Sequence, residues 1–385
     1  MTQQGQRNSS LDPVAEGPEL DRLRRAIDAV DRQILENLNE RARLVQDVGR
    51  LKQSESTPVY AAARERDIVA RLREANDGPF PDAGLPHVFR EIISATRSLE
   101  RVVRVSFLGP EGSFAHLAAR RQFGGLADLI AAPTIPEVYA AVERGHADLG
   151  VVPIENTTEG VVTQSLDRCV ESEVTICAEI LLRISQCLMS RSGRLEDVAR
   201  VASHPQGLAQ CRDWLARNLP QAEQVETSST ARAAEWAAET PDVGAIAGEI
   251  AAEIFGLECI ERAIEDQRDN TTRFLVIGER PPAPSGRDLT SVVFTLRKSE
   301  AGALHRLLDP FAHHGVNLAS IQSRPLKGRP WEYLFFVDLE GHVAEQRVQD
   351  ALADAAKRVN SYKVLGSFPR ADVKAEDGAQ IGVGS

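Results

Sequence analysis

The sequence predicts a multidomain chain: an all-α helical block, then a two-lobed α/β block, then a small α+β block. Three observations predict this order. Apolar residues recur at three- and four-residue steps over residues 18–103, a spacing typical of amphipathic helices. Apolar strand-like runs alternate with helical patterns over 104–280. A proline-rich linker, 281–288, then leads to a βαββαβ order over 289–370, which is typical of a ferredoxin-like arrangement.

The composition limits the possible classes of function. The chain has 385 residues, 42% hydrophobic and 26% charged, which is typical of a globular protein with several domains. A net charge of −11 argues against a general role on nucleic acids or membrane surfaces. No run approaches the ~20 apolar residues of a membrane span. The polar ends, 1–17 and 371–385, are expected to be tails, the first of them disordered.

Motif searches favour neither a metal site nor a nucleotide site. The five cysteines lack CxxC and Cys/His metal spacing, so the sequence predicts reduced thiols in the cytoplasm. Neither GxGxxG nor GxxxxGK[ST] occurs. We therefore expect a cytoplasmic protein that works on a small molecule without metal or cofactor.

The helical block begins with a helix of more than thirty residues from residue 18, and shorter helices are predicted around 62–76 and 85–101. Much of so long an apolar stripe would stay exposed to water in a monomer. The sequence therefore predicts an intertwined helical dimer.

Two cations of the first helix lie on its apolar side. Arg41 and Lys52 are eleven residues apart, so they nearly superpose around the helix axis, with Val45 between them. Arg24 lies about 100° away from Arg41 around the same helix. Arg24 therefore either pairs with Asp28 one turn on or reaches a pocket of a partner subunit.

Polar residues also share the apolar faces of the second and third helices. They are Glu65 in the second helix, and Thr96 and Glu100 in the third. Burying an unpaired charge is costly, so these groups need partners. Two interpretations remain open: an internal salt-bridge network with the cations of the first helix, or a cationic pocket for a dianionic ligand.

The helical block resembles the all-helical type of chorismate mutase over about 80 residues. The resemblance is carried by Glu40-Arg41, Val48-Gly49-Arg50-Leu51-Lys52, Arg64-Glu65-Arg66 and Phe89-Arg90-Glu91-Ile92-Ile93-Ser94, beside Leu23-Arg24. It implies an interleaved dimer that rearranges chorismate to prephenate without a covalent step.

The same resemblance implies roles for the polar residues. Arg24 of the partner subunit, Arg41, Lys52 and Arg64 would hold the two carboxylates, with Lys52 also near the ether oxygen. Glu65 would accept from the ring hydroxyl, and Thr96 stands at a small polar position. Ala61 replaces an acidic residue of the family, and Glu100 replaces an amide. Because Glu100 could donate a hydrogen bond only when protonated, mutase activity is expected to decline above neutral pH.

Three polar clusters border strand-like runs in the α/β block. They are Pro153-Ile154-Glu155-Asn156-Thr157, Ser203-His204-Pro205-Gln206 and Asp269-Asn270-Thr271-Thr272-Arg273-Phe274. Open α/β sheets bind ligands at strand ends, so these clusters predict a pocket for a small oxygen-rich anion. Its hydroxyl and amide groups could donate a proton without a metal or a strong nucleophile.

This block resembles prephenate dehydratase over about 175 residues, with further matches at Gly109-Pro110-Glu111-Gly112-Ser113-Phe114 and Ser229-Thr230-Ala231. The resemblance implies two α/β lobes with the site in the cleft between them and Thr272 as general acid. His204 is interpreted as structural. The substrate-binding residues that the resemblance implies are Ser113, Glu155, Asn156, Thr157, Gln206, Ser229, Thr230, Arg273 and Phe274.

The C-terminal block resembles the ACT regulatory domain, through Gly302-Ala303-Leu304 and Ile321-Gln322-Ser323-Arg324-Pro325. The resemblance implies that phenylalanine binds at the interface of paired domains, with its carboxylate at the helix start after Gly302. Gln322 replaces an acidic residue of the family, so a contact with the ligand's ammonium group is expected to be weaker. A purely dimerising module is the alternative.

Taken together, these resemblances predict an enzyme that converts chorismate to prephenate and then to phenylpyruvate, as a homodimer or a dimer of dimers, under control by phenylalanine. Two alternatives remain. One is a prephenate dehydratase whose helical block only dimerises, as Ala61 and Glu100 allow. The other is a non-catalytic regulator that responds to aromatic amino acids, although no basic stripe or helix-turn-helix supports it.

Overall fold

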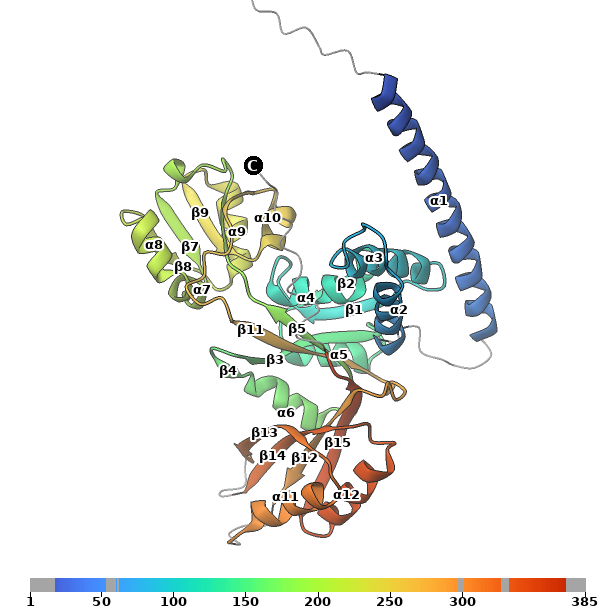
Figure 1. The fold of residues 1–385 in the computed structure, drawn as a ribbon. Coiled ribbons are helices and arrows are strands. Elements are labelled where there is room, and N and C mark those ends of the chain that lie inside the picture. The colour runs from blue at the N-terminus through green and yellow to red at the C-terminus, as the bar shows by residue number, and fades with distance from the viewer. Residues whose placement is uncertain (1–17, 53–59, 61, 297–300, 327–331, 372–385) are drawn as a thin grey trace, which may run out of the picture. The chain divides into compact units, whose positions relative to one another are not determined.

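The computed structural model describes residues 18–52, 60, 62–296, 301–326 and 332–371 (Figure 1). The chain divides into two compact units, 1–57 and 58–385. The first unit contributes helix α1, and the second contributes all other described elements.

Helix α1 spans Pro18–Lys52, which confirms the predicted long first helix over its described part. Its apolar stripe is exposed: Leu23, Ile27, Val30 and Ile34 are between 50% and 60% exposed. A stripe of this length facing water is the arrangement that a second helix or a second copy of the chain would cover.

The other two predicted helices are confirmed as α2 (Ala62–Glu74) and α3 (Leu85–Ser98). Pro86 stands in the first turn of α3, where its missing N–H removes no helical hydrogen bond. Helix α3 packs on α2 and also on α4 (Phe114–Phe123) of the next block, burying Leu85 and Ile93.

The first lobe of the α/β block has a six-stranded sheet with the order β2-β1-β3-β11-β5, and β4 pairs with β3. Helices α5 (Ile135–Glu143) and α6 (Thr163–Glu171) also belong to this lobe. Its strands are β1 (Arg104–Leu108), β2 (Asp128–Ala132), β3 (Leu149–Asn156), β4 (Gly160–Val161), β5 (Thr175–Arg183) and β11 (Thr271–Gly278).

The second lobe has a five-stranded sheet with the order β10-β6-β9-β7-β8. The chain enters this lobe after β5 and returns to the first lobe through β11. Its strands are β6 (Cys187–Ser190), β7 (Arg200–Ser203), β8 (Glu223–Glu226), β9 (Val243–Ala247) and β10 (Glu258–Glu261). Its helices are η1 (Leu195–Asp197), α7 (Pro205–Gln210), α8 (Arg212–Asn218), α9 (Thr230–Glu239) and α10 (Glu249–Phe255).

Both sheets are mixed rather than purely parallel. Strands β1, β2 and β3 are parallel, but β11 runs antiparallel to both β3 and β5. In the second lobe, β6 is antiparallel to β9 and β10. The reversal follows from connectivity, because β11 re-enters the first lobe from the second instead of through a helix crossover.

The C-terminal domain confirms the predicted βαββαβ order. Its four strands are antiparallel in the order β13-β14-β12-β15, the ferredoxin-like arrangement. Helices α11 (Ala303–His313) and α12 (Gln346–Ala356) cover one face of the sheet. The strands are β12 (Asp288–Thr295), β13 (Leu318–Pro325), β14 (Tyr333–Glu340) and β15 (Ser361–Pro369).

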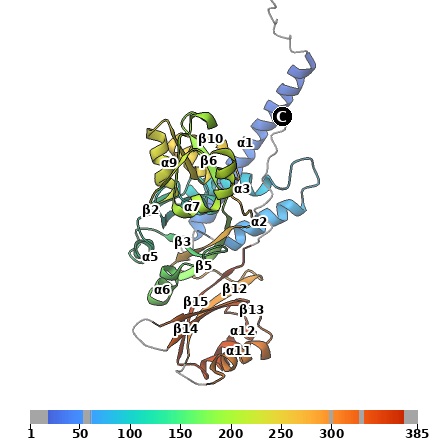
Figure 2. The same ribbon diagram turned by 90° about the vertical axis from the view of Figure 1, so that its left-hand side faces the viewer.

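The opposite face of the C-terminal sheet packs on the first lobe. Phe336 and Phe368 share one apolar cluster with Leu166 of α6 and Ile176 of β5. Both views show α6 between the sheet of the first lobe and the C-terminal sheet (Figures 1 and 2). The C-terminal domain therefore shares a core with the first lobe.

Candidate functional site

Thr272 and Asn156 lie directly opposite each other on β11 and β3, at the end of the first-lobe sheet. Asn156 Nδ2 donates hydrogen bonds to Thr272 Oγ1 and to Asn270 Oδ1, each over 2.8 Å. Thr272 is 9% exposed and Asn156 is 8% exposed. The predicted acid is therefore held by an amide in a nearly dry setting.

The orientation of the Asn156 amide follows from its other contacts. Its Oδ1 accepts from the backbone N–H groups of Thr158, over 2.9 Å, and Glu159, over 3.1 Å. Because a backbone N–H can only donate, this end must be the oxygen, and the NH₂ end faces Thr272. The Thr272 oxygen therefore receives a hydrogen bond, and its own hydrogen is directed to another acceptor.

Thr157 fastens the same turn to β11. Its backbone N–H donates to Thr271 O, and its Oγ1 accepts from Thr271 N, each over 3.0 Å. The Thr157 hydroxyl also lies 3.4 Å from Asn270 Oδ1. Asn270, which the sequence analysis quoted but gave no role, is thus a shared acceptor that orders both Asn156 and Thr157.

The turn after β3 lies close to the second lobe. Burial raises the pKa of Glu159, and the nearby imidazole of His204 opposes this rise. His204 is the N-cap of α7, where its Nδ1 accepts from Gln206 N over 3.3 Å. This local contact agrees with the structural interpretation of His204. The interaction between Glu159 and His204 places the start of α7 near the Asn156 turn.

Two ten-residue helices begin where the lobes touch. Ser113 caps α4 by accepting from His116 N over 3.3 Å, and Ser229 caps α9 by accepting from Arg232 N over 3.1 Å. A Cβ on Gly112 would lie only 3.5 Å from Ala231 Cβ in the first turn of α9. The two helix N-termini are therefore close together, and both favour anions.

Thr230 lies beside Gly207, the residue after Gln206 in the second lobe, because a Cβ on Gly207 would lie 3.6 Å from Thr230 Cγ2. The structure thus brings Ser113, Gln206, Ser229 and Thr230 together at the lobe interface. The Asn156–Thr272 pair faces the same region through Glu159. Such an arrangement can bind carboxylates at helix starts and present one hydroxyl hydrogen to another group of the same ligand.

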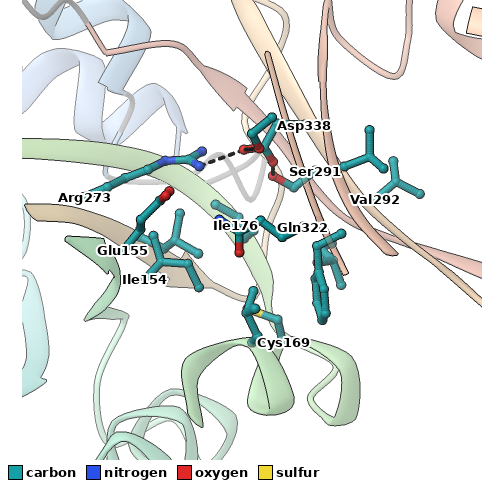
Figure 3. Close-up of a pocket in the computed structure, with 15 residues that line it drawn as sticks. Ile154, Glu155, Cys169, Ile176, Arg273, Ser291, Val292, Gln322 and Asp338 are labelled. Atoms are coloured by element: carbon teal, nitrogen blue, oxygen red, sulfur yellow. Dashed lines mark hydrogen bonds and ion pairs between the residues drawn. The ribbon is translucent and has the colours of Figure 1, made fainter. Parts of the chain in front are cut away.

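Arg273 and Glu155 lie on the other face of the first-lobe sheet. Side chains alternate along β11, so Thr272, Phe274 and Val276 face one core while Arg273 and Leu275 face the C-terminal domain. Glu155 is the register partner of Arg273 and lines the same pocket (Figure 3). Both side chains therefore lie on the face of the sheet opposite to Thr272.

The Arg273 guanidinium joins two domains. Its Nε donates to Glu179 on β5 over 2.8 Å, and its Nη1 donates to Asp338 on β14 over 2.7 Å. Burial disfavours the charged form, but both carboxylates raise the pKa of Arg273, so it stays ionised. Figure 3 shows this guanidinium reaching toward Asp338 across the pocket.

Phe274 is a core residue rather than an exposed ligand contact. It is 2% exposed and packs in the apolar cluster with Phe107, Ile180 and Leu182. Its place on β11, two residues from Thr272, puts it on the same face and below the hydroxyl. It supports the site from inside the lobe.

Glu65 of the helical block pairs with a residue that the sequence analysis did not single out. Arg97 Nη1 donates to Glu65 Oε1 over 2.6 Å, and Arg97 Nη2 donates to Phe123 O over 2.7 Å. Arg97 also lies over the Tyr60 ring, with its Cζ 5.6 Å from the ring centroid. Glu65 is thus tied to α3 and, through Arg97, to the end of α4.

The remaining predicted mutase residues differ in environment. Thr96 is buried, and its Oγ1 donates to Ile92 O over 2.8 Å. Arg64 is exposed, and Glu100 is partly buried just after α3. In α1, Arg24 is exposed and Arg41 is partly buried, whereas Ala61 and the side chain of Lys52 lie outside the described residues.

The predicted ligand residues of the C-terminal domain fall into two groups. Gly302 precedes α11 with φ +78°, a value that favours glycine, and no side chain of a described residue caps the helix start at Ala303 and Leu304. On β13, Ser323 and Pro325 are exposed.

Gln322 and Arg324 alternate with Ser323 and Pro325, and so face the first lobe. Gln322 lines the same pocket as Arg273 (Figure 3). Arg324 Nη2 donates to Asp167 Oδ2 of α6 over 2.8 Å. The four predicted ligand residues of β13 are therefore divided between the two faces of this strand.

No cluster of three or more metal-binding side chains occurs among the residues that the structure describes. Within that same part of the chain, no helix combines the length and apolarity needed to cross a membrane. All five cysteines are free.

Comparisons with known proteins cover all three blocks. Residues 23–101 match the family model of chorismate mutase type II, and 105–282 match that of prephenate dehydratase. Residues 290–357 match the ACT domain.

A bifunctional chorismate mutase/prephenate dehydratase of Aquifex aeolicus is 46% identical, over 92% of this chain and 98% of that protein. The solved prephenate dehydratase from Arthrobacter aurescens, in complex with L-Phe, is 38% identical with a TM-score of 0.64, over 70% of this chain and 91% of that one. A solved chain described as GqqA, a novel type of quorum quenching acylases, is 30% identical with a TM-score of 0.64, over 69% of this chain and 98% of that one.

Proposed function

The chain belongs to the family of bifunctional chorismate mutase/prephenate dehydratases, and we propose which of its residues carry out the two reactions. It has an ACT regulatory domain at its C-terminal end. The dehydratase assignment depends above all on one observation: the Asn156 amide donates to Thr272 Oγ1.

In the dehydratase reaction, prephenate loses CO₂ and its ring hydroxyl. The bond from the ring to its carboxylate breaks, and its electron pair completes the aromatic ring as the ring C–O bond breaks. Thr272 donates its hydrogen to the departing hydroxyl, which leaves as water, and solvent returns a proton to Thr272. Asn156 favours transfer of the hydrogen from Thr272 to the substrate, because its amide already donates a hydrogen bond to the Thr272 oxygen.

The substrate carboxylates are held at the lobe interface. The helix starts at Ser113 and Ser229 supply backbone N–H groups and positive ends of helix dipoles. Thr157, Gln206 and Thr230 supply further polar groups around the same interface. Arg273 acts from the opposite face of the sheet, by fixing β11 through Glu179 and Asp338, and Glu155 shapes the electrostatics beside it.

In the mutase reaction, cations hold the two carboxylates of chorismate. Arg41, Lys52 and Arg64 are the binding groups of one subunit, and Arg24 reaches in from the partner subunit. Holding the reactive conformer and stabilising charge at the ether oxygen lower the barrier without a covalent step. Glu65, which Arg97 holds in place, accepts from the ring hydroxyl, and Thr96 and Glu100 complete the polar wall.

A second copy of this chain covers the apolar stripe of α1. Supporting this, α1 is a 35-residue helix whose Leu23, Ile27, Val30 and Ile34 are all at least half exposed. An interleaved homodimer buries that stripe and places Arg24 in the partner's mutase site. Sedimentation at micromolar concentration should give at least twice the mass of the 42.0 kDa chain.

The ACT domain binds phenylalanine and thereby inhibits the dehydratase. The Arthrobacter aurescens relative contains L-Phe in its solved structure. In this chain, the uncapped helix start after Gly302 offers N–H groups to a carboxylate, and exposed Ser323 and Pro325 offer a second surface. The protein acts in the cytoplasm, a place in which five free thiols stay reduced.

A coupled assay tests these assignments: chorismate is added, and prephenate and phenylpyruvate are measured separately. Thr272→Ala should abolish phenylpyruvate formation and leave prephenate formation unchanged, whereas Thr272→Ser should retain activity. Near-normal dehydratase activity in Thr272→Ala would reject the acid. Chorismate left unconsumed by the unaltered protein would favour a helical block that only dimerises.

A further inference from the structure

Arg273, the residue next to the proposed acid, is bound in part by the C-terminal sheet, which lies outside the dehydratase lobes. Arg273 follows Thr272 on β11, and its guanidinium is bound by Glu179 and by Asp338 of the C-terminal sheet. The Glu179 side chain is 5% exposed and that of Asp338 is 12% exposed. These contacts are therefore shielded from water, and strong hydrogen bonds to a charged group fix the strand at this point.

Strand β11 needs such an anchor because its pairing with β3 is irregular here. Arg273 pairs with Glu155, but Phe274 pairs with Pro153, so Ile154 is an extra residue in β3. A bulge of this kind interrupts the hydrogen-bond ladder and bends the strand. The ladder between β3 and β11 therefore fixes the Thr272 end of β11 less firmly than a regular one would.

Asp338 is itself immobilised within the C-terminal sheet. Its Oδ2 accepts from Ser320 Oγ over 2.9 Å, and its Oδ1 accepts from Ser291 Oγ. These hydroxyls belong to β13 and β12, the strands on either side of β14. The Asp338 carboxylate thus links the Arg273 guanidinium to three strands of the C-terminal sheet.

A second ion pair joins the same sheet to the other half of the site. Arg324 on β13 donates to Asp167 of α6, and both side chains are largely buried. Helix α6 begins just after β4, which follows the Asn156–Glu159 turn. The C-terminal sheet therefore holds both chain segments that meet at the Asn156–Thr272 hydrogen bond.

We propose that Asp338 is a positioning residue for the dehydratase reaction: it acts through Arg273 and so sets the place of the Thr272 hydroxyl. The inference depends on the proposed role of Thr272. The ACT domain then contributes a positioning residue to the dehydratase site. A ligand that moves β14 would also move Arg273, and with it the Thr272 hydroxyl. No contact between Asp338 and prephenate is required.

The test is Asp338→Asn, which keeps the shape and removes the charge, measured with both activities of the same sample. We expect the dehydratase kcat to fall about tenfold, because misplacing a catalytic group by a fraction of an ångström already has an effect of this size. The KM for prephenate should change less than twofold. Mutase turnover should be unchanged and serves as the internal measure of folded protein.

Asp350→Asn is the matched control. Asp350 is an exposed residue of α12 in the same domain and accepts only a local bond from Gln346 among the described contacts. Both activities should be unchanged in this variant. The control separates loss of the Arg273 contact from loss of a negative charge on the domain.

A double-mutant cycle identifies the route. If Asp338 acts through Arg273, Asp338→Asn should lower kcat less than twofold in an Arg273→Gln background. The same tenfold loss in that background would overturn the proposal, as would a kcat within twofold of normal in Asp338→Asn alone. A parallel fall of both activities would also overturn it, since the carboxylate would then serve folding. Failure of the proposed acid would appear separately, as activity in Thr272→Ala.

Discussion

The Asn156 amide donates to the Thr272 hydroxyl oxygen, while the amide oxygen is occupied by the N–H groups of Thr158 and Glu159. The pair is therefore polarised in one direction, with the hydroxyl hydrogen left for a ligand. An amide is required for this arrangement, because a carboxylate in the same place would accept the hydroxyl hydrogen instead.

Asn156→Asp should therefore lower the dehydratase kcat by about 100-fold, a loss typical of a misdirected proton donor. Mutase turnover in the same sample should not change. Lowering the pH should recover part of the activity, because a protonated Asp can donate to Thr272 again. Asn218→Asp, on the exposed end of α8, is the control and should have no effect. A normal kcat in Asn156→Asp would show that the direction of this hydrogen bond does not matter.

Arg97 joins the helical block to the dehydratase, and its loss should be costly. Arg97→Leu leaves Glu65, 21% exposed, without the cation 2.6 Å away. Breaking a buried pair lowers the free energy of unfolding by about 3–5 kcal/mol, so partial exposure here suggests about 2–4 kcal/mol. Urea denaturation of the two proteins measures the difference.

Arg120→Leu provides the comparison for Arg97→Leu. Arg120 pairs with Glu253 over 2.7 Å, but the two side chains are 38% and 63% exposed. Exposed pairs contribute about 0–1 kcal/mol. Equal losses of stability in the two variants would mean that burial does not increase the contribution of the Arg97–Glu65 pair to the free energy of unfolding.

Much of this architecture could be predicted because its signals are local. The stripe of α1 and the βαββαβ order each lie within a short stretch of sequence. Strand β5 was not predicted, since Glu179 divides its apolar residues and they show no alternating period that separates strand from helix. The edge strands β2 and β10 were not predicted either, because runs of five and four residues are too short to show a clear period.

The sequence indicated candidate site residues but not the partners of their side chains. Thr272 and Arg273 are adjacent in sequence, yet they face different cores, which the alternation of β11 does indicate. Glu179 and Asp338 stand 94 and 65 residues from Arg273, and no local pattern reveals them. The sequence therefore indicated Arg273 as a candidate site residue but could not show its ion pairs with β5 and the C-terminal sheet.

Cys259 should be the reactive cysteine of this protein. A hydrogen bond from the Cys187 thiol lowers the pKa of Cys259 to about 7 and raises that of Cys187. Burial raises the pKa of Cys177 to about 12 and that of Cys169 to about 11. Because the thiolate is the nucleophile, alkylation should label Cys259 first, with a rate that rises through neutral pH.

Cys187→Ala tests the cause of this reactivity. Without the donor, the Cys259 thiolate loses stabilisation, so its pKa should rise toward the ordinary value of about 8.5 and labelling at pH 7 should slow. Cys177→Ala, which removes a buried thiol elsewhere, should leave the profile in place. Mass spectrometry after iodoacetamide treatment measures the labelling of Cys259 as a function of pH in both variants. If Cys187→Ala has the same pH midpoint as the unaltered protein, the Cys187 thiol does not cause the reactivity of Cys259.

Gly366 lets the C-terminal sheet approach the first lobe. A Cβ on Gly366 would lie 2.4 Å from Ile176 O and 2.7 Å from Ile176 N, both backbone atoms of β5. Backbone cannot rotate away as a side chain can, so Gly366→Ala must push β15 off β5. Overpacking of this kind lowers the free energy of unfolding by about 1–3 kcal/mol.

Gly366→Ala should also weaken the hydrogen bonds that residues near Gly366 on β15 make with the first lobe. The Leu365 carbonyl accepts from Thr175 Oγ1 over 3.1 Å, and Lys363 Nζ donates to Val170 O over 3.0 Å. We therefore expect faster proteolysis in the 281–288 segment along with the lower stability. Gly78→Ala is the control, since its nearest neighbour would be Asn76 Oδ1 at 3.9 Å. If both variants resist protease like the unaltered chain, close approach at Gly366 does not hold the two domains together.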